Sequence, residues 1–358
     1  MKNRRSWIAN IAIAVLLTLG LSVGSGQADQ PNPGSNDSPQ ITAPVETSVP
    51  TSTTTAAQTT PEDLYRQVWR NANENFLWRD RLTTFDQWEH KYDGKLATQA
   101  DAEKAINEML DVLKDGYSYF RNNGQTQTKA AATAATNVVT YRMIGSVGYI
   151  KIATFGSENA ASETEAAIRA LNKVGAKAYI VDLRDNGGGY VAQAFSITGM
   201  FLDAGEFATV KGHRHGKPYT EVMTVTKTTL EDKENGKVTS NVTRVGNLTG
   251  NKPVFILVNG GSASASEMFA GSLRDNGRAK LIGQKTFGKG IAQLNMDLAF
   301  NTSMQVTYAQ LYQPAGKSIH GVGMTPDEVV APVAKVDAQL DRALALATPK
   351  PAKAKGKP

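Results

Sequence analysis

The sequence VNGGSASASEMFAGSLRDNG, residues 258–277, places three serines between an apolar run and an amphipathic run. The apolar run at 253–259 predicts a buried strand, and residues 263–275 predict a helix that ends at Asn276-Gly277. The serines therefore lie at a helix N-terminus, where backbone N–H groups are unpaired and the helix dipole is positive. A nucleophilic serine in such a strand-to-helix elbow has an oxyanion site beside it, formed by the next amide. The simpler interpretation is that Ser and Ala suit a tight helix start.

Strands and helices alternate around this stretch. Strands are predicted at 147–152 and 178–183, helices at 160–174 and 190–202, and further paired strands at 206–226 and 291–313. The glycine-rich segment Arg184-Asp185-Asn186-Gly187-Gly188-Gly189 follows the second of these strands and by itself indicates a turn. Alternating strands and helices with added hairpins predict an α/β fold.

A small helical domain is predicted at 60–121, ahead of the α/β core. Thr60-Pro61 and Thr98 with Asp101 are helix-start signals, and apolar residues recur at helical spacing after each. A shorter helix is expected near 84–92. The small, polar residues that follow the domain predict a linker to the core.

The two ends of the chain are predicted to lie outside the folded body. Residues 1–28 combine a basic start, an apolar run and a small-residue cleavage site, which is typical of a signal peptide; an uncleaved membrane anchor is the alternative. Residues 29–59, rich in Thr, Ser and Pro, predict a disordered linker, and 348–358 a basic disordered tail. The body is then a core at 140–335 with a C-terminal helix at 336–347.

The net charge of +6 does not indicate a nucleic-acid-binding protein. The basic start contributes +3 and the tail +4, which leaves −1 for residues 29–347 and no basic face for nucleic acid. The chain has no cysteine, which excludes disulfides and thiolate metal sites. No later stretch has the ~18 apolar residues that a spanning helix needs. Any membrane contact is therefore expected only through an uncleaved N-terminus.

A serine nucleophile needs a base. The histidines are His90, His213, His215 and His320. The first lies in the helical domain, the next two flank a hairpin turn without a third metal ligand, and nothing marks the last, although it could form a Ser-His pair. Lys289 is the better candidate, because the glycines on either side let the backbone turn sharply and approach closely. A surface lysine in a loop is the simpler interpretation.

A lysine acts as a base only when it is neutral. At the ordinary lysine pKa of ~10.4, about one side chain in 2,500 is neutral at pH 7. A Ser-Lys pair therefore needs a dry pocket and an orienting hydrogen bond. Gln293, four residues after the candidate lysine, is an uncharged group that could supply that bond.

Four segments together resemble the carboxyl-terminal processing peptidases, also called tail-specific proteases. These are serine–lysine endopeptidases of the cell envelope and of plastids. The longest segment runs from 258 to 293, and the others are GYIKI at 148, VDLRDNGGG at 181 and GKSIHGVGMTPD at 316. In this order they cover about residues 145–330. The resemblance implies a Clp-protease/crotonase-like core of repeated ββα units, here preceded by the small helical domain.

The resemblance also implies roles for individual residues. Ser264, the middle serine, would be the nucleophile, Lys289 the general base and Gln293 the residue that orients the lysine. No metal or cofactor is implied.

An oxyanion hole is implied next to the nucleophile. It would consist of the amide of Ala265 with one from the turn at Gly188 and Gly189. Ser262 and Ser266 would then be left with capping and packing roles.

The sequence departs from the family in one large respect. Typical members insert a PDZ domain of on the order of 80–90 residues between the helical domain and the core. Between Phe120 and Val147 this chain has 26 residues, too few for an independent domain. Recruitment of substrate would then depend on the helical domain, an adaptor or a groove beside the hairpin at 206–226.

The sequence thus predicts an exported serine endopeptidase of the periplasm or cell envelope, which cleaves protein or peptide substrates near their C-termini through an acyl-enzyme. A non-catalytic ligand- or protein-binding relative on the same scaffold is the alternative, and the presence of all three implied catalytic residues favours the enzyme. A third hypothesis is an enzyme held silent by its own N-terminal segment. The helical domain is also a candidate for homo-oligomer contacts.

Overall fold

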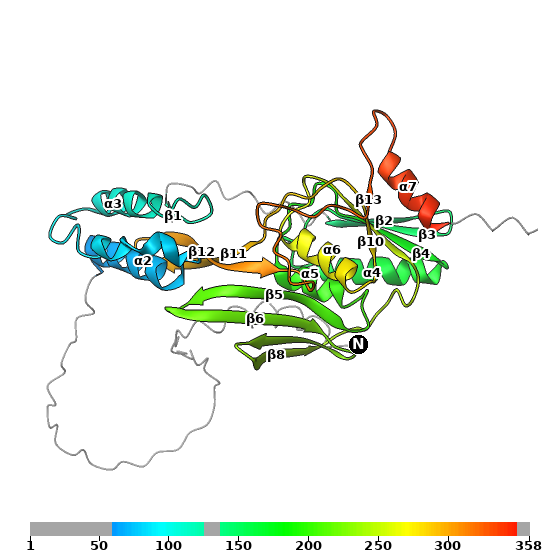
Figure 1. Cartoon of the computed structure of the whole chain (residues 1–358), viewed down its shortest axis with the longest axis horizontal. Coiled ribbons are helices and arrows are strands. Elements are labelled where there is room, and N and C mark those ends of the chain that lie inside the picture. Colours follow the sequence, from blue (N-terminus) through cyan, green and yellow to red (C-terminus); the bar gives the residue numbers. More distant parts are fainter. Residues whose placement is uncertain (1–58, 125–136, 349–358) are drawn as a thin grey trace, which may run out of the picture.

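A computed structural model describes residues 59–124 and 137–348 of the 358-residue chain (Figure 1). At its centre is a six-stranded sheet in the order β13-β10-β9-β4-β3-β2, parallel except between β2 and β3. The strands are β2 Val139–Ile144, β3 Val147–Ile152, β4 Ala178–Asp182, β9 Val254–Val258, β10 Lys280–Gly283 and β13 Glu328–Val329. Every residue of β4 and β9 is buried, as expected for apolar strands in the middle of a parallel sheet.

Helices cover both faces of this sheet. The helices α4 Ala160–Lys173, α5 Val191–Thr198 and α6 Ala265–Asp275 share the largest apolar core with one face. On the other face, α7 Ala338–Ala347 packs against alternate residues of β3, β4 and β9. The predicted α/β class is confirmed, although the helix expected to reach residue 202 ends at Thr198.

A second, antiparallel sheet runs alongside the first (Figure 1). Its order is β1-β12-β5-β6-β7-β8, and β11 also pairs with β12. The strands of this sheet are β1 Tyr119–Asn122, β5 Gly205–Arg214, β6 Lys217–Val225, β7 Thr229–Glu234, β8 Lys237–Thr243, β11 Ile291–Leu298 and β12 Thr302–Tyr312. The pairs expected at 206–226 and 291–313 are present. Strands β7 and β8 were not predicted, because most of their residues are polar and show no apolar alternation.

The helical segment packs on this second sheet. Its helices, α2 Pro61–Asn75 and α3 Gln99–Asp111, each begin at a Thr-x-x-Asp capping box. They share an apolar core with Met304 and Val306 of β12. The segment and the sheet therefore have one core in common.

The helical segment also contributes a strand and two short turns of helix. Strand β1, Tyr119–Asn122, pairs with β12 so that Tyr119 lies opposite Gln305. In place of the short helix expected near 84–92 there are two 3-10 turns, Arg79–Leu82 and Phe85–Trp88.

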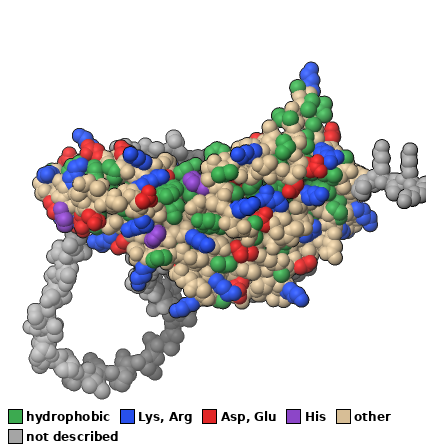
Figure 2. All heavy atoms as spheres, viewed as in Figure 1, with side chains coloured by type: hydrophobic (Ala, Val, Ile, Leu, Met, Phe, Trp, Pro, Cys, Tyr) green, Lys and Arg blue, Asp and Glu red, His purple; other side chains and the backbone are tan. Residues whose placement is uncertain are grey.

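The predicted signal peptide, the linker at 29–59 and the basic tail lie almost wholly outside the described residues. Within the described ranges, no helix combines the length and apolarity needed to cross a bilayer. Figure 2 shows basic and acidic side chains interspersed over the visible face, without a large patch of one sign. This distribution agrees with the near-neutral charge expected for the body of the chain.

Carboxyl groups gather where β6 meets β7. Asp232 on β7 lies beside Glu221 of β6, which accepts a hydrogen bond of 2.6 Å from the Tyr219 hydroxyl. Burial raises the pKa of Asp232 to about 8, and the carboxylates of Glu221 and Glu234 add to the effect. The folded protein therefore favours the protonated form of Asp232 well above the usual range for a carboxyl group.

This raised pKa predicts a stability that falls with pH. Because the folded pKa exceeds the ordinary 3.8, the stabilisation is fully present below about pH 4 and is lost as the pH rises through about 8. Asp232→Asn keeps a neutral side chain at every pH, so its free energy of unfolding should exceed that of wild type by an amount that grows between pH 5 and pH 8.5. We expect this difference to reach about 1–2 kcal/mol. It is a fraction of what the full pKa shift would give, because water screens a partly exposed carboxyl group. Thermal melts at both pH values measure this. Asp297→Asn, on an exposed site of β11, is the control. If the free energies of unfolding of Asp232→Asn and wild type differ by the same amount at both pH values, the prediction is wrong.

Candidate active site

The three serines around the start of α6 have different environments. Ser262 and Ser266 are fully buried, and their hydroxyls donate to the carbonyls of Leu183 and Asn186, each at 2.8 Å. They tie the start of α6 to the segment that follows β4. Ser264 alone stays partly exposed, at the N-cap of α6, so its side chain is the one that a substrate can reach.

The backbone of Ser264 is strained. Its φ is +57° and its ψ −119°, a conformation that residues with a side chain rarely adopt. Such strain persists only where the surrounding structure holds it, and it concentrates at functional sites. Here it turns the chain sharply from β9 toward α6, which is the elbow expected from the sequence.

Glu267 was not among the predicted site residues, yet it connects them. Its fully buried carboxylate accepts hydrogen bonds through Oε2 from the N–H groups of Ser264 and Lys289, both at 2.9 Å. Through Oε1 it accepts from Thr286 Oγ1 at 2.5 Å and from Gly288 N–H at 2.9 Å. Because one oxygen serves both, the backbones of Ser264 and Lys289 are adjacent. A Ser-x-x-Glu capping-box pattern at 264–267 is the signal that could have identified this residue.

Lys289 lies in the loop between β10 and β11. The loop is packed tightly, since a Cβ on Gly288 would lie 2.7 Å from the backbone nitrogen of Gly323. The amine faces the ring of Tyr117, with Nζ 5.2 Å from the ring centroid. Within the described residues the amine forms no hydrogen bond or ion pair, so the expected bond to Ser264 is not made in this conformation.

Gln293 lies on β11 at a bulge, opposite Thr307 of β12. Its Nε2 is buried without a hydrogen-bond partner among the described residues, and so is the hydroxyl of Thr307. The expected hydrogen bond from Gln293 to Lys289 is therefore also absent. Two polar side chains without a hydrogen-bond partner among the described residues therefore lie opposite each other on neighbouring strands.

Two of the predicted oxyanion-hole residues, Gly188 and Ala265, come together at Ser264. Gly188 and Gly189 have φ of +100° and +139°, and a Cβ on Gly188 would lie 2.9 Å from Ser264 Cβ and 3.0 Å from the nitrogen of Ala265. The N–H of Gly188 already donates to Asn186 Oδ1 at 2.9 Å. The N–H groups of Gly189 and Ala265 have no acceptor in the described part of the chain. Two amide donors, one on the residue after Ser264 and one on the residue after Gly188, therefore remain without an acceptor in the described part of the chain.

Within the described part of the chain, no hydrogen bond joins a histidine side chain to Ser264. His90 is exposed, with Nδ1 3.0 Å from Asp93, and the ring of His320 packs on Trp78 with 6.0 Å between centroids. Burial, together with the charge of a nearby arginine, lowers the pKa of His213. Among the described residues, no group of three or more His, Asp or Glu side chains could hold a metal ion.

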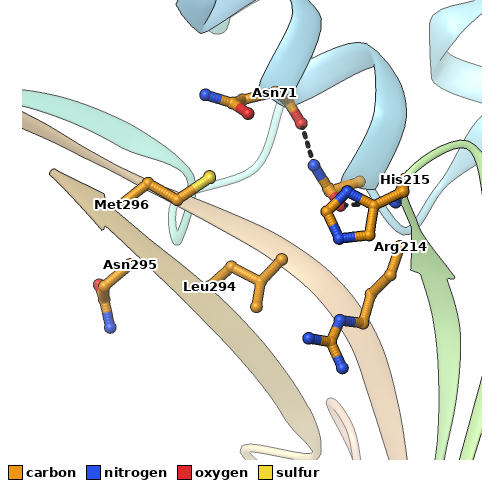
Figure 3. Close-up of a pocket in the computed structure, with 7 residues that line it drawn as sticks. Asn71, Arg214, His215, Leu294, Asn295 and Met296 are labelled. Atoms are coloured by element: carbon orange, nitrogen blue, oxygen red, sulfur yellow. Dashed lines mark hydrogen bonds between the residues drawn. The ribbon is translucent and has the colours of Figure 1, made fainter. Parts of the chain in front are cut away.

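A cavity of about 50 Å³ lies where the tip of the β5–β6 hairpin meets α2 and β11 (Figure 3). Its lining is Asn71, Asn75, Arg214, His215, Leu294, Asn295 and Met296. It contains none of the predicted site residues, and it is far smaller than the ~300 Å³ of an ordinary ligand pocket. The cavity marks the docking of the hairpin on α2, where His215 N–H donates to Asn75 Oδ1 at 3.1 Å.

Known proteins with similar sequences are carboxyl-terminal processing proteases. That of Bartonella bacilliformis is 39% identical over 196 residues, which are 54% of this chain and 40% of that protein. That of Synechocystis sp. is 37% identical over 185 residues, 52% of this chain and 38% of that protein. The chain thus spans about two fifths of the length of these relatives.

Solved structures share the fold at low sequence identity. The photosystem II D1 C-terminal processing protease has a TM-score of 0.58 and 19% identity, over 76% of this chain and 93% of that one. A lipoprotein from Streptococcus agalactiae has a TM-score of 0.60 and 15% identity, over 80% and 96%. Both likenesses extend over about three quarters or more of this chain, and they agree with the predicted fold.

A family model, Peptidase family S41, matches residues 146–330, which is more than half of the chain. The matched segment includes every predicted site residue from Gly188 to Gln293. This chain therefore belongs to peptidase family S41.

Proposed function

We propose that this chain is a serine endopeptidase that cleaves protein or peptide substrates near their C-termini. The observation that carries the proposal is the shared acceptor: Glu267 Oε2 takes hydrogen bonds from both Ser264 N–H and Lys289 N–H. The backbones of Ser264 and Lys289, which belong to two different loops, are thereby anchored side by side. The family and its relatives support proteolysis as the reaction.

In the proposed reaction, Ser264 Oγ attacks the scissile carbonyl while Lys289 Nζ accepts the hydroxyl proton and returns it to the leaving amine. The resulting acyl-enzyme is hydrolysed by a water that the same amine activates. For this chemistry the amine moves from the ring of Tyr117 toward Ser264. The side-chain amide of Gln293, which no other described group engages, then orients it.

The oxyanion of the tetrahedral intermediate would be bound by the N–H groups of Ala265 and Gly189. Gly188 is the less suitable donor, because its N–H is already bonded to Asn186 Oδ1. Phe155, which forms an isolated bridge with Gly189, pairs with Gly188 O and Tyr190 N–H, and this leaves the Gly189 N–H on the opposite side. Each such donor typically contributes about 10²–10³ in kcat.

We also propose that the protein is exported, on the basis of the basic and apolar residues in 1–28. Substrate capture would not use a PDZ domain, because residues 123–138 between β1 and β2 are too few to form one.

A comparison of variants tests the proposal. Wild type, Ser264→Ala and Lys289→Ala are incubated with an unfolded protein that ends in apolar residues, and products are mapped by mass spectrometry. Each substitution is expected to lower the cleavage rate at least about a thousandfold, because it removes a group that makes or breaks a bond. The cleavage sites should lie near the substrate's C-terminus.

Ser162→Ala, at an exposed serine in the first turn of α4, is the matched control and should retain full activity. Thermal melts show that each variant is folded. If Ser264→Ala and Lys289→Ala digest the substrate as wild type does, the assignment is wrong. If wild type binds but never cleaves it, the chain is a binding relative on the same scaffold.

A further inference from the structure

Tyr117 brings the helical segment into contact with the candidate base. It lies between α3 and β1, and its ring is the partner of the Lys289 amine at 5.2 Å. An ammonium group over an aromatic ring is stabilised by about 0.5–2 kcal/mol, depending on how far it is desolvated. Among the described residues this ring is the amine's one polar or electrostatic contact.

The position of Tyr117 is fixed from both sides. Its N–H donates to Asp115 Oδ1 at 3.1 Å, and its carbonyl accepts from Gln305 Nε2 of β12 at 2.8 Å. The next residue, Ser118, donates to Asp115 Oδ2 at 2.6 Å and accepts from the N–H of Thr307 at 2.9 Å. The ring is therefore carried on a backbone that is bonded directly to the second sheet.

This attachment links Tyr117 to the pair of strands that carries the residue proposed to orient the lysine. Thr307, which bonds to Ser118, is also the cross-strand neighbour of Gln293. The buried polar atoms of Gln293 and Thr307 have no partner among the described residues. Tyr117 is therefore linked through Ser118 and Thr307 to the strand pair that carries Gln293.

Among the described residues, no charged or titratable group near Lys289 binds its amine in place of the ring. The carboxylate of Glu267 is occupied by four donors, including the Lys289 N–H. His320 lies across Gly290, where a Cβ would come within 2.7 Å of its backbone nitrogen, and its ring packs on Trp78. No carboxylate of the described chain pairs with the amine.

We propose that Tyr117 is a positioning residue for Lys289: the face of its ring holds the amine between turnovers and shields it from water. This inference rests on the proposed role of Lys289 as the general base. The phenol oxygen takes no part, because no described group hydrogen-bonds to it, so the aromatic face is the element required. The helical segment thereby supplies one side of the active site.

Two substitutions distinguish an effect of the aromatic ring from an effect of side-chain volume. Tyr117→Leu keeps apolar volume but removes the ring, and it is expected to lower kcat about tenfold while KM stays within about twofold. Tyr117→Phe keeps the ring and should stay within about twofold of wild type in both constants. Tyr141→Leu, at a half-exposed tyrosine on β2, is the control for loss of a tyrosine elsewhere and should behave as wild type.

A spectroscopic readout makes the test independent of catalysis. In lysine-labelled protein, the ε-methylene resonance of Lys289, assigned by its loss in Lys289→Gln, should be shifted upfield by the ring current of Tyr117. The shift should persist in Tyr117→Phe and vanish in Tyr117→Leu. A wild-type resonance at the position of a free lysine, or a Leu variant with unchanged kcat, overturns the proposal. If the ring-current shift is present but Ser264→Ala still cleaves substrate, the contact stands and the proposed function fails instead.

Discussion

Replacing Glu267 with glutamine is expected to destabilise the protein by about 3 kcal/mol and to lower kcat/KM at least about a hundredfold. The carboxylate is fully buried, and both of its oxygens accept hydrogen bonds from two donors each. A glutamine side chain replaces one acceptor oxygen with an NH2 group, so two of the donors lose their partner whichever way the amide is turned. A displacement of even 1 Å between Ser264 and Lys289 is enough to cost about 10² in rate.

Thermal melts and substrate hydrolysis measure both parts of this prediction. The melting temperature should fall by roughly 6–12 °C. Glu163→Gln is the matched control, because Glu163 Oε2 accepts a single backbone N–H, that of Val139 at 2.9 Å. It should lose less than about 1 kcal/mol and no activity. A Glu267→Gln enzyme that melts and cleaves like the control would show that the shared acceptor does not hold the site together.

A methyl group on Gly188 is expected to abolish most of the activity, whereas one on Gly187 should not. At Gly188 the new Cβ would lie 2.7 Å from Ala263 O, 2.9 Å from Ser264 Cβ and 3.0 Å from Ala265 N. Its φ of +100° is also strained for any residue with a side chain. The substitution therefore pushes the proposed nucleophile and a proposed oxyanion donor away from their positions, and kcat should fall by about 10² or more.

Gly187→Ala is an unusually close control for this prediction. A Cβ on Gly187 meets no atom within 4 Å, and its backbone is not in the left-handed region. Steady-state kinetics should show a kcat for Gly187→Ala that is about 10² or more above that of Gly188→Ala, with KM differing less than kcat. Equal activities would mean that the glycine-rich turn does not form part of the oxyanion site.

The sequence was most informative where local pattern and tertiary burial agree. The apolar run at 253–259 became β9, and the serine-alanine stretch became the N-terminus of α6, because a central parallel strand must be apolar throughout. The choice of Ser264 over its neighbours could not come from spacing. It required the resemblance, and the structure now gives a physical difference, since Ser262 and Ser266 are buried and bonded to backbone carbonyls.

Other parts of the structure could not be predicted because they depend on contacts that are distant in sequence. Strand β1 is defined only by its pairing with β12, and its own four residues carry no clear alternation. The contact between Tyr117 and Lys289 likewise joins two segments that no local pattern connects. Glu267 is the exception, because its capping-box spacing was visible but its reach to the Lys289 loop was not.

The pairing of β1 with β12 determines when, during synthesis of the chain, the proposed active site can be completed. Tyr119 meets Gln305 across a separation of 186 residues, so this contact closes a very long loop. Synthesis proceeds from the N-terminus, and α2 and α3 are therefore made long before the strand on which they pack. Tyr117 can reach the amine only once Ser264, Lys289 and β12 have all been translated. A partly made chain therefore lacks the assembled arrangement of residues on which the proposed activity depends.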